Sequence, residues 1–336
     1  MTSESGRPPR PPSRQSLLGT GPGAPDSRER RPEGPEAKEW RADSLAHSHH
    51  SRLDAEISRP KEDFDEERAA LLCAGIVREV LGDFAPALLL LPTTERRRAQ
   101  ALLAYAHTLF DFARQTGTEG ERLAQINRWE FTLEAAFSGQ PVGQPIFVRM
   151  ARENERRRWP VDALDELAAA ARRRATRPRP ATLADAEADA RSLSRALGTA
   201  LLEKGLTAEI NDLASALVRL WGLQHIGEEV RRHRCPLPES ELPEDGDGGL
   251  DPGRLLAAVR TECARLRPRL LRSPRGLVDL PHGYRRAAVF ALLAGLRLLS
   301  DIEDSDAGLL QTPPRLGVGS RIGFLLRARW FGTAGS

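Results

Sequence analysis

The sequence predicts an all-α fold, and two observations lead to that prediction. Of the 336 residues, 40% are hydrophobic but only 5% are aromatic, and alanine, leucine and arginine, which favour helices, dominate. Long alternating runs of valine, isoleucine and threonine, which are typical of strands, do not occur. About 265 residues remain after an atypical N-terminal segment, enough to bury one sizeable core. We therefore expect a single helical domain, a barrel or a bundle.

Residues 1–64 differ in composition from the rest and are predicted to form a disordered tail. Arginine, proline, glycine, serine and glutamate recur there, and few apolar residues occur before Leu45. Such a segment cannot bury enough apolar surface to offset the entropy lost on ordering. Transit peptides are poor in acids, so Glu29 and Glu33 argue against one. The helical domain is predicted to occupy residues 65–336.

Charge and cysteine content exclude some classes of function and indicate a cellular location. The net charge is only +3, acids are interleaved with the basic residues, and no nucleic-acid-binding module is present, so no nucleic-acid partner is expected. Basic runs such as Arg172-Arg173-Arg174 are interpreted as solvated helix faces. No signal-peptide region and no run of about 18 uncharged apolar residues occurs. The sequence predicts a cytoplasmic protein with Cys73, Cys235 and Cys263 as reduced thiols.

The first central helix is predicted over residues 95–116. An apolar lead-in, Leu88 to Pro92, precedes it, and Tyr105-Ala106 lies at its middle. A second helix is predicted from Leu123 to Phe137, containing Trp129 and ending before a glycine and a proline, which are typical helix stops.

A third helix is predicted to begin after Thr182. Asp185 follows three residues later, which indicates a capping box, although aspartate is a weaker partner than glutamate there.

A fourth helix is predicted across residues 213–229. Leu213, Leu217 and Leu220 recur at helical spacing and predict a face turned to the core. On a continuous helix, residues four apart share a face, so His225 and Glu229 are expected to be neighbours.

The C-terminal region predicts two helices, Tyr284 to Ile302 and Arg321 to Trp330. The second mixes cations with large apolar and aromatic side chains. Packing of its apolar side on the domain is one interpretation. The alternative is peripheral contact with an anionic membrane surface through this basic and apolar helix.

In order and spacing, these motifs resemble the squalene and phytoene synthase family from around residue 70 to the C-terminus. In that family the helix at 213–229 carries two aspartates four apart, then a basic run, and stops at a Leu-Pro pair. Here His225 and Glu229 occupy the aspartate positions, and Leu237-Pro238 closes the element. The resemblance implies a single-domain helical barrel or bundle of the isoprenoid-synthase type, magnesium as cofactor of an active member, and a prenyl diphosphate or other isoprenoid lipid as ligand.

The family's other acidic motif departs further from the pattern. Alignment on Tyr105-Ala106 places uncharged residues at the aspartate positions, namely Phe112, Ala113 and Thr116. Asp111 lies one residue away, which on a helix is a rotation of about 100° off that face. Magnesium prefers oxygen ligands, whereas imidazole suits zinc, copper, iron or nickel better, so His225 is a poor replacement.

The resemblance leaves few candidate site residues. The metal candidates are Glu229, Glu228 and Asp111, and the catalytic candidates are Tyr105 and His225. Arginine pairs oxyanions bidentately, so the diphosphate candidates are the basic run of Arg231, Arg232 and Arg234. Two bland alternatives stay open: an ion pair between Glu228 and Arg232 on a solvated face, and a purely structural, hydrogen-bonded His225.

Two function hypotheses follow. In the first, the acidic motifs are largely lost, no cofactor is needed, and the chain is a non-catalytic, prenyl-lipid-binding protein with a regulatory or assembly role and a protein partner. In the second, it is a magnesium-dependent transferase that condenses two prenyl diphosphates head to head. The small number of aligned acids favours the first, because a departing diphosphate would lack most of its metal neutralisation.

Overall fold

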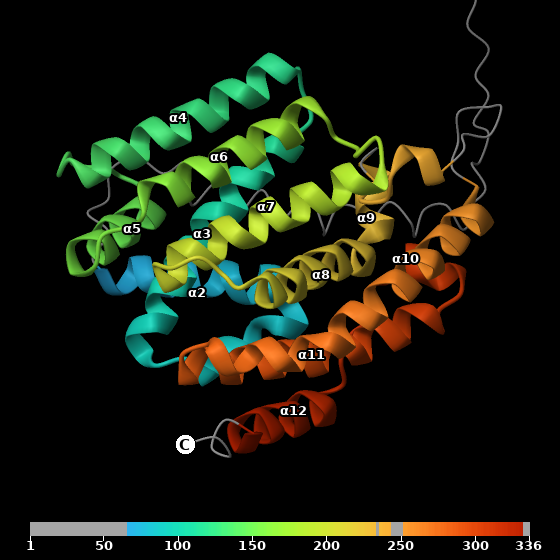
Figure 1. Cartoon of the computed structure of the whole chain (residues 1–336). Coiled ribbons are helices and arrows are strands. Elements are labelled where there is room, and N and C mark those ends of the chain that lie inside the picture. The colour runs from blue at the N-terminus through green and yellow to red at the C-terminus, as the bar shows by residue number, and fades with distance from the viewer. Residues whose placement is uncertain (1–65, 233–234, 243–250, 332–336) are drawn as a thin grey trace, which may run out of the picture. The chain divides into compact units, whose positions relative to one another are not determined.

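The computed structural model describes residues 66–232, 235–242 and 251–331, and this part of the chain is built from helices without strands (Figure 1). That observation confirms the predicted all-α fold. The predicted tail, Arg234 and residues 243–250 lie outside the described residues. The α-helices are α2 (Glu66–Leu81), α3 (Thr93–Arg114), α4 (Glu119–Phe137), α5 (Pro145–Arg156), α6 (Val161–Thr176), α7 (Leu183–Leu202), α8 (Ala208–Gln224), α9 (Ile226–Arg231), α10 (Pro252–Arg272), α11 (His282–Glu303) and α12 (Val318–Phe331). Short 3₁₀-helices are η1 (Gly82–Leu90), η2 (Glu239–Glu241), η3 (Ser273–Asp279) and η4 (Ala307–Leu310).

Helix α3 lies at the centre of the N-terminal group of helices and contacts α2, α4, α5, α6 and α7. Its buried positions include small side chains, which permit close helix approach: Ala99, Ala101, Ala104, Ala106 and Ala113. Tyr105 is also buried, and its ring stacks on Trp129 of α4 with centroids 6.1 Å apart. Phe147 of α5 packs on the same indole at 4.3 Å. Tyr105 and Trp129 are therefore core residues that join α3, α4 and α5.

Helix α8 has the corresponding place in the C-terminal group, against α7, α10 and α11. The hydrophobic core between these helices includes Leu220, Leu266, Leu270, Phe290 and Leu298, all fully buried. Burial of each such side chain stabilises the fold by roughly 1.5–3 kcal/mol. The predicted helices from Tyr284 to Ile302 and from Arg321 to Trp330 are confirmed as parts of α11 and α12.

Two helix starts follow from their capping residues. The Thr182 hydroxyl accepts a hydrogen bond from the Asp185 N–H at 3.2 Å, and the Asp185 carboxylate accepts one from the Thr182 N–H at 3.0 Å. The predicted capping box is thereby confirmed, and it satisfies two backbone donors at the start of α7. Thr118 and Glu121 form a second capping box at the start of α4.

The predicted continuous helix across residues 213–229 is wrong at its end. Helix α8 ends at Gln224, His225 leaves helical geometry with φ −103° and ψ 17°, and α9 begins at Ile226. The His225 N–H and its ring Nδ1 both bond the Trp221 carbonyl, at 3.3 and 2.9 Å. A side chain that competes for a carbonyl one turn earlier bends or ends a helix. Glu229 is therefore placed by α9 and not by the axis of α8.

Gly227 explains how α9 leaves that axis. An ideal Cβ at Gly227 would lie 1.9 Å from the Leu310 carbonyl oxygen of η4. Only a residue without a side chain permits this approach, so the glycine lets α9 pack directly on η4.

A buried carboxylate holds α12 against the rest of the domain. Asp83 of η1 is 1% exposed and accepts hydrogen bonds from Arg321 of α12 at 2.6 Å and from Gln224 of α8 at 3.0 Å. Gln224 also donates to the Pro314 carbonyl at 2.8 Å. Among the described helices, none is long and apolar enough to cross a membrane.

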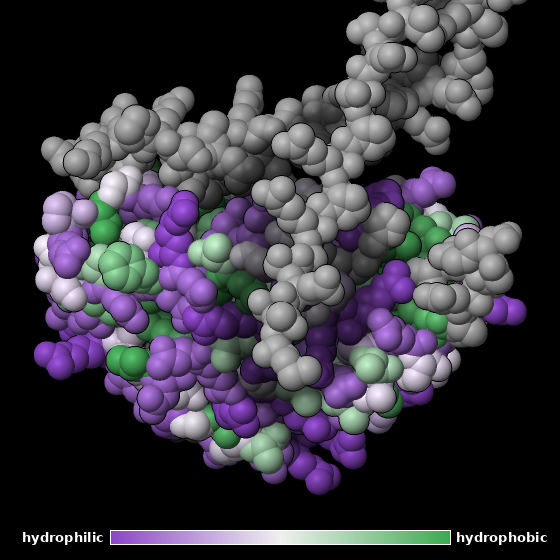
Figure 2. Space-filling view, turned by 90° about the horizontal axis from the view of Figure 1, so that it is seen from above, coloured by the Kyte–Doolittle hydropathy of each residue, from purple (hydrophilic) through white to green (hydrophobic). Residues whose placement is uncertain are grey.

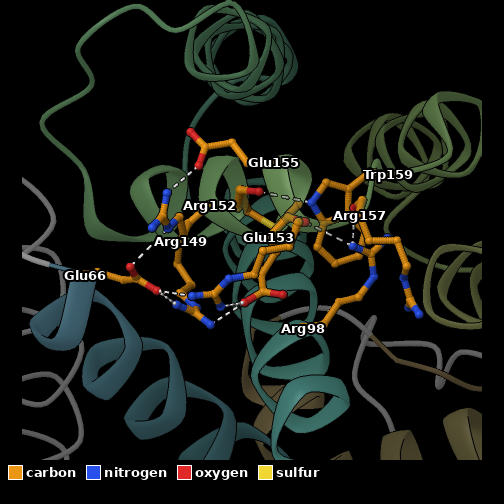
Figure 3. Close-up of polar contacts among 10 residues, drawn as sticks. Glu66, Arg98, Arg149, Arg152, Glu153, Glu155, Arg157 and Trp159 are labelled. Carbon is orange, nitrogen blue, oxygen red and sulfur yellow. Dashed lines mark hydrogen bonds and ion pairs between the residues drawn. The ribbon is translucent and has the colours of Figure 1, made fainter.

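Arg98 of α3 closes the C-terminal end of α5 (Figure 3). Its guanidinium donates to the Arg157 and Arg158 carbonyls at 2.5 and 3.1 Å and lies 3.6 Å from the centroid of the Trp159 ring. Carbonyls at a helix end lack intrahelical donors, so a buried cation there satisfies them and complements the helix dipole.

A second ion network in the same view joins α2 to α5 (Figure 3). The buried Arg149 donates to Glu66 at 2.9 Å and also to Glu153, one turn further along α5. Arg152 and Arg156 bond Glu66 as well. Every one of these cations has a carboxylate partner, so the network is a structural link between the two helices.

We predict that Arg98→Ala lowers the free energy of unfolding by about 2–4 kcal/mol, since it removes hydrogen bonds to the carbonyls that follow α5 and leaves a cavity beside Trp159. Chemical denaturation measures the change. The adjacent Arg97 is exposed, so Arg97→Ala is the matched control and should stay within about 0.5 kcal/mol of the parent. Equal losses in the two variants would contradict this interpretation of Arg98.

We also predict that Gly227→Ala destabilises the protein by about 1–3 kcal/mol, because the new methyl group overlaps the Leu310 carbonyl. Gly323, within α12, has no described atom within 4 Å of an ideal Cβ. Gly323→Ala should therefore stabilise slightly, by up to about 1 kcal/mol, through helix propensity. Thermal unfolding of the pair gives opposite shifts if the close approach at Gly227 is real.

Candidate functional site

A large apolar cavity lies inside the helical domain and is the candidate site. Its volume is about 560 Å³, within the usual range for small-molecule sites. Residues from α2, η1, α3, α6, α7, α8 and α11 line it, among them Leu103, Phe110, Leu193, Leu197, Leu217 and Trp221. Among the coloured residues of the face shown in Figure 2, hydrophilic side chains predominate and apolar ones are scattered.

One face of α3 supplies a wall of the cavity. The residues concerned recur at intervals of three and four: Leu103, Ala106, His107, Phe110 and Arg114. Residues with this spacing share a helix face. A pair of metal-binding acids four apart would need to lie on that face, and this chain has Phe110 and Arg114 there.

Glu229 of α9 lies at the polar end of the cavity between two arginines. Its Oε1 is 3.9 Å from Nε of Arg114, and its Oε2 is 3.8 Å from Nη2 of Arg174 on α6. The Glu229 side chain is 5% exposed, and those of Arg114 and Arg174 are 16% and 20% exposed. Both separations exceed the 2.7–3.2 Å typical of a hydrogen bond. Within the described residues, neither Arg114 Nε nor Glu229 Oε2 has a hydrogen-bond partner.

The other carboxylates that line the cavity have closer partners. Glu262 of α10 accepts from Arg219 of α8 at 2.6 Å, and from Arg265 at 3.4 Å. Asp189 of α7 lies 3.4 Å from Arg173 on the outer side of α6. Glu262 and Asp189 are each paired with arginines outside the Glu229 group, although Asp189 also acts on the Arg174 cation electrostatically. Within the group itself, two cations, Arg114 and Arg174, face the one carboxylate of Glu229.

Burial lowers the pKa of one arginine in this group but does not remove its charge. The pKa of Arg174 is lowered from its ordinary value, first by burial and then by the neighbouring Arg114 cation, while Glu229 opposes the shift. Arginine stays protonated in proteins at neutral pH even when its pKa falls. The polar end of the cavity is therefore cationic.

Of the residues predicted from sequence, Glu229 lines the cavity and most of the others do not. Asp111 is half-buried and is not part of the lining, while its neighbour Phe112 packs on Trp129. Tyr105 belongs to the aromatic core, where burial raises the pKa of its hydroxyl. His225 stacks on Trp221 with centroids 4.6 Å apart and bonds the Trp221 carbonyl.

The predicted basic run also lies away from the cavity lining. Glu228 pairs with Arg232 at 2.9 Å, in the solvated arrangement that the sequence left open as an alternative. Arg231 is exposed and donates to the Leu310 carbonyl at 2.9 Å, and Arg234 lies outside the described residues. Roles for these arginines in diphosphate binding stay predictions.

Sequence reasoning missed Arg114 and Arg174. Arg174 ends a basic run that was interpreted as a solvated face, but its side chain is mostly buried against Glu229. The signal that could have found Arg114 is its spacing, four residues after Phe110 and seven after His107, on the face of α3 that the apolar residues mark.

The residues at the polar end do not fit the magnesium ion that the family resemblance implies. No group of three histidine, cysteine, aspartate or glutamate side chains that could hold a metal occurs in the described part of the chain. At an effective dielectric constant of about 20, a divalent ion about 5 Å from a guanidinium is repelled by roughly 7 kcal/mol, and its attraction to one carboxylate about 3 Å away is roughly 11 kcal/mol. Two such guanidiniums, Arg114 and Arg174, offset the attraction of Glu229.

Comparisons with known proteins agree with this architecture. A crystal structure of a dehydrosqualene synthase in complex with ligand is similar to this chain, with a TM-score of 0.63 and 14% identity, over 80% of this chain and 98% of that one. The squalene synthase HpnC from Alicyclobacillus acidocaldarius gives a TM-score of 0.57 and 18% identity, over 74% and 97%. YisP from Bacillus subtilis subsp. subtilis strain 168 gives 0.51 and 15%, over 78% and 96%. Identities this low show a common fold, the all-α isoprenoid-synthase fold.

None of the curated proteins matches the chain significantly. A family model described as squalene/phytoene synthase matches residues 77–319, which is most of the chain. The chain therefore belongs to the squalene/phytoene synthase family.

Proposed function

We propose that this protein binds a prenyl lipid in its central cavity and does not catalyse the magnesium-dependent condensation of two prenyl diphosphates. The observation that carries the proposal is the charge of the side chains at the polar end of the cavity. Two arginines, Arg114 and Arg174, flank the one carboxylate of Glu229 where the family pattern has metal-binding acids. Such a member of the family would act in isoprenoid metabolism as a lipid-binding, regulatory or assembly protein. An active transferase that condenses two prenyl diphosphates is the alternative.

The chemistry of the condensation explains why arginines in place of metal-binding acids matter. Ionisation of an allylic diphosphate separates a carbocation from an anion of charge near −3 in a pocket from which water is excluded. Metal ions held by several carboxylates neutralise that leaving group and activate it as Lewis acids. One carboxylate that already faces two arginines cannot gather those ions, so the binding function is favoured over turnover.

The cavity itself supports a prenyl ligand. Its walls are almost entirely aliphatic and aromatic, and its volume of about 560 Å³ leaves room for one chain of farnesyl size. Leu103 and Phe110 of α3 and Leu193 and Leu197 of α7 are among the apolar residues of this lining. Non-directional apolar contacts of this kind bind a flexible hydrocarbon chain without requiring catalysis.

We further propose that this protein lies in the cytoplasm and contacts a membrane peripherally. The outer surface of α12 supports the membrane contact. Val318, Ile322, Leu326 and Trp330 recur every four residues and are 70%, 54%, 55% and 75% exposed. Because four residues turn a helix by about 400°, they form one apolar stripe. Arg327 and Arg329 are exposed beside it, so the stripe suits an anionic lipid surface.

We predict that the purified chain, incubated with farnesyl diphosphate and magnesium, releases no pyrophosphate and forms no presqualene diphosphate or squalene above a protein-free blank. Binding of farnesol to the same preparation, followed by tryptophan fluorescence, shows that the cavity is intact. Turnover that disappears in Glu229→Ala would contradict the proposal, because it would assign the carboxylate to a working metal site.

For the membrane surface, we predict that the chain co-sediments with vesicles containing about 30% anionic lipid and that Trp330→Ser weakens this binding severalfold, since an aromatic anchor and its apolar area are lost. Phe131 of α4 is similarly exposed, at 71%. Phe131→Ser is therefore the matched control and should bind as the parent does. Equal losses in both variants, or equal binding to neutral vesicles, would rule out α12 as the contact surface.

A further inference from the structure

The two arginines at the polar end of the cavity have more hydrogen-bond donors than Glu229 can accept. Each guanidinium carries five N–H groups, and the carboxylate approaches each of them only to 3.9 and 3.8 Å. Nε of Arg114 is buried without a hydrogen-bond partner in the described structure. The group is therefore a loose ion cluster, with cationic donors available at the polar end of an apolar cavity.

Helix ends explain how two cations can be held close together there. Arg114 is the last residue of α3, and Arg174 lies in the last turn of α6. The C-terminal end of a helix carries a partial negative charge from its unpaired carbonyls, which stabilises a cation nearby. Trp221 adds to this, since the Arg114 guanidinium lies 5.4 Å from its ring centroid. These contacts hold the cations in place while leaving guanidinium donors for a ligand.

We propose that Arg114 and Arg174 form an oxyanion site that holds the phosphate or diphosphate head of a prenyl lipid directly, without a divalent metal. The proposal rests on the proposed function, because the cavity must receive the prenyl chain. It names the chemical class of the ligand: a phosphate ester with an apolar tail. Guanidinium groups bind phosphate oxygens bidentately, and two of them, on α3 and α6, can contact the two phosphoryl groups of one diphosphate.

Glu229 then acts as an internal counter-ion and not as a metal ligand. With no anion bound, its carboxylate reduces the repulsion between the Arg114 and Arg174 cations. When a phosphate ester binds, Glu229 competes with it for the same guanidiniums. Its removal should therefore strengthen binding of the ester, whereas removal of a metal ligand would weaken it. The opposite signs make Glu229→Gln the decisive substitution, and glutamine keeps the shape of the side chain.

The experiment measures the affinity of the full chain for farnesyl diphosphate, farnesyl phosphate and farnesol by titration calorimetry, first in EDTA and then with added magnesium. We expect Arg114→Gln and Arg174→Gln each to weaken binding of the phosphate esters by roughly ten- to hundredfold, as for loss of a charged hydrogen bond, and to leave farnesol unchanged. Arg195 of α7 is exposed and pairs with Glu166, and neither residue lines the cavity. Arg195→Gln is the matched control and should leave all three affinities unchanged.

Three results would overturn the oxyanion site. In the first, the parent binds farnesyl diphosphate only when magnesium is added. In the second, Glu229→Gln binds the phosphate esters more weakly than the parent does. In the third, Arg174→Gln loses affinity for farnesol and for farnesyl diphosphate equally. An unfolded Arg114→Gln variant leaves the test intact, because Glu229→Gln and Arg174→Gln each address the site separately.

A tail-free ligand separates this proposal from the function on which it rests. Inorganic pyrophosphate in EDTA should raise the melting temperature of the parent chain and of Arg195→Gln, but not that of Arg174→Gln. If farnesol fails to bind while pyrophosphate stabilises the parent in this way, the lipid-binding function is wrong and the oxyanion site stands. If farnesol binds and pyrophosphate does not stabilise the parent, the oxyanion site is wrong and the lipid-binding function stands.

Discussion

The electrostatic balance around Glu229 is the constraint on which the function of this fold depends. A carboxylate that is 5% exposed cannot remain charged in an apolar surrounding unless cations lie near it. Arg114 and Arg174 provide those cations, but at 3.9 and 3.8 Å they compensate its charge without saturating their own donors. The same balance opposes a divalent ion and favours an anion. Under the function proposed here, a few charges at one end of an aliphatic cavity decide between gathering metal ions and holding a phosphate directly.

The packing of the helices is largely independent of whether the cavity binds metal ions or a phosphate. Trp129 joins α3, α4 and α5 through aromatic packing, Arg98 closes α5, and Asp83 holds α12, and none of the three lines the cavity. Loss of metal-binding residues from a helix face therefore costs the fold little, because those residues contribute charge repulsion and not packing. A family can keep its architecture while the chemistry at the cavity changes, which is why the fold is evidence for ancestry and the site is evidence for function.

The sequence predicted most of the fold but only part of the site, and the reason differs between elements. Helix composition, the Thr182 capping box and the two C-terminal helices depend on local patterns, and all are confirmed. The break at His225 depends on a side chain that competes for the Trp221 carbonyl and on the approach of η4 to Gly227, which are contacts that helical periodicity does not contain. Arg174 was interpreted as solvated because a run of three arginines hides which of them the neighbouring helices bury. Glu229 was found because its spacing and the family pattern coincide.

The break after α8 lies between Gln224, which contacts residues that hold the outer helix α12, and Glu229, which lines the cavity. Gln224, the last residue of α8, donates both to Asp83 and to the Pro314 carbonyl, and Asp83 in turn accepts from Arg321 of α12. Five residues after Gln224, Glu229 lies at the polar end of the cavity. Gln224 and Asp83 thus link the end of α8 to α12, while Gly227 seats α9 on η4. The short backbone segment from Gln224 to Glu229 therefore begins and continues in residues fixed by polar contacts and by close packing, and the place of the carboxylate follows from the break at His225 and not from the axis of α8.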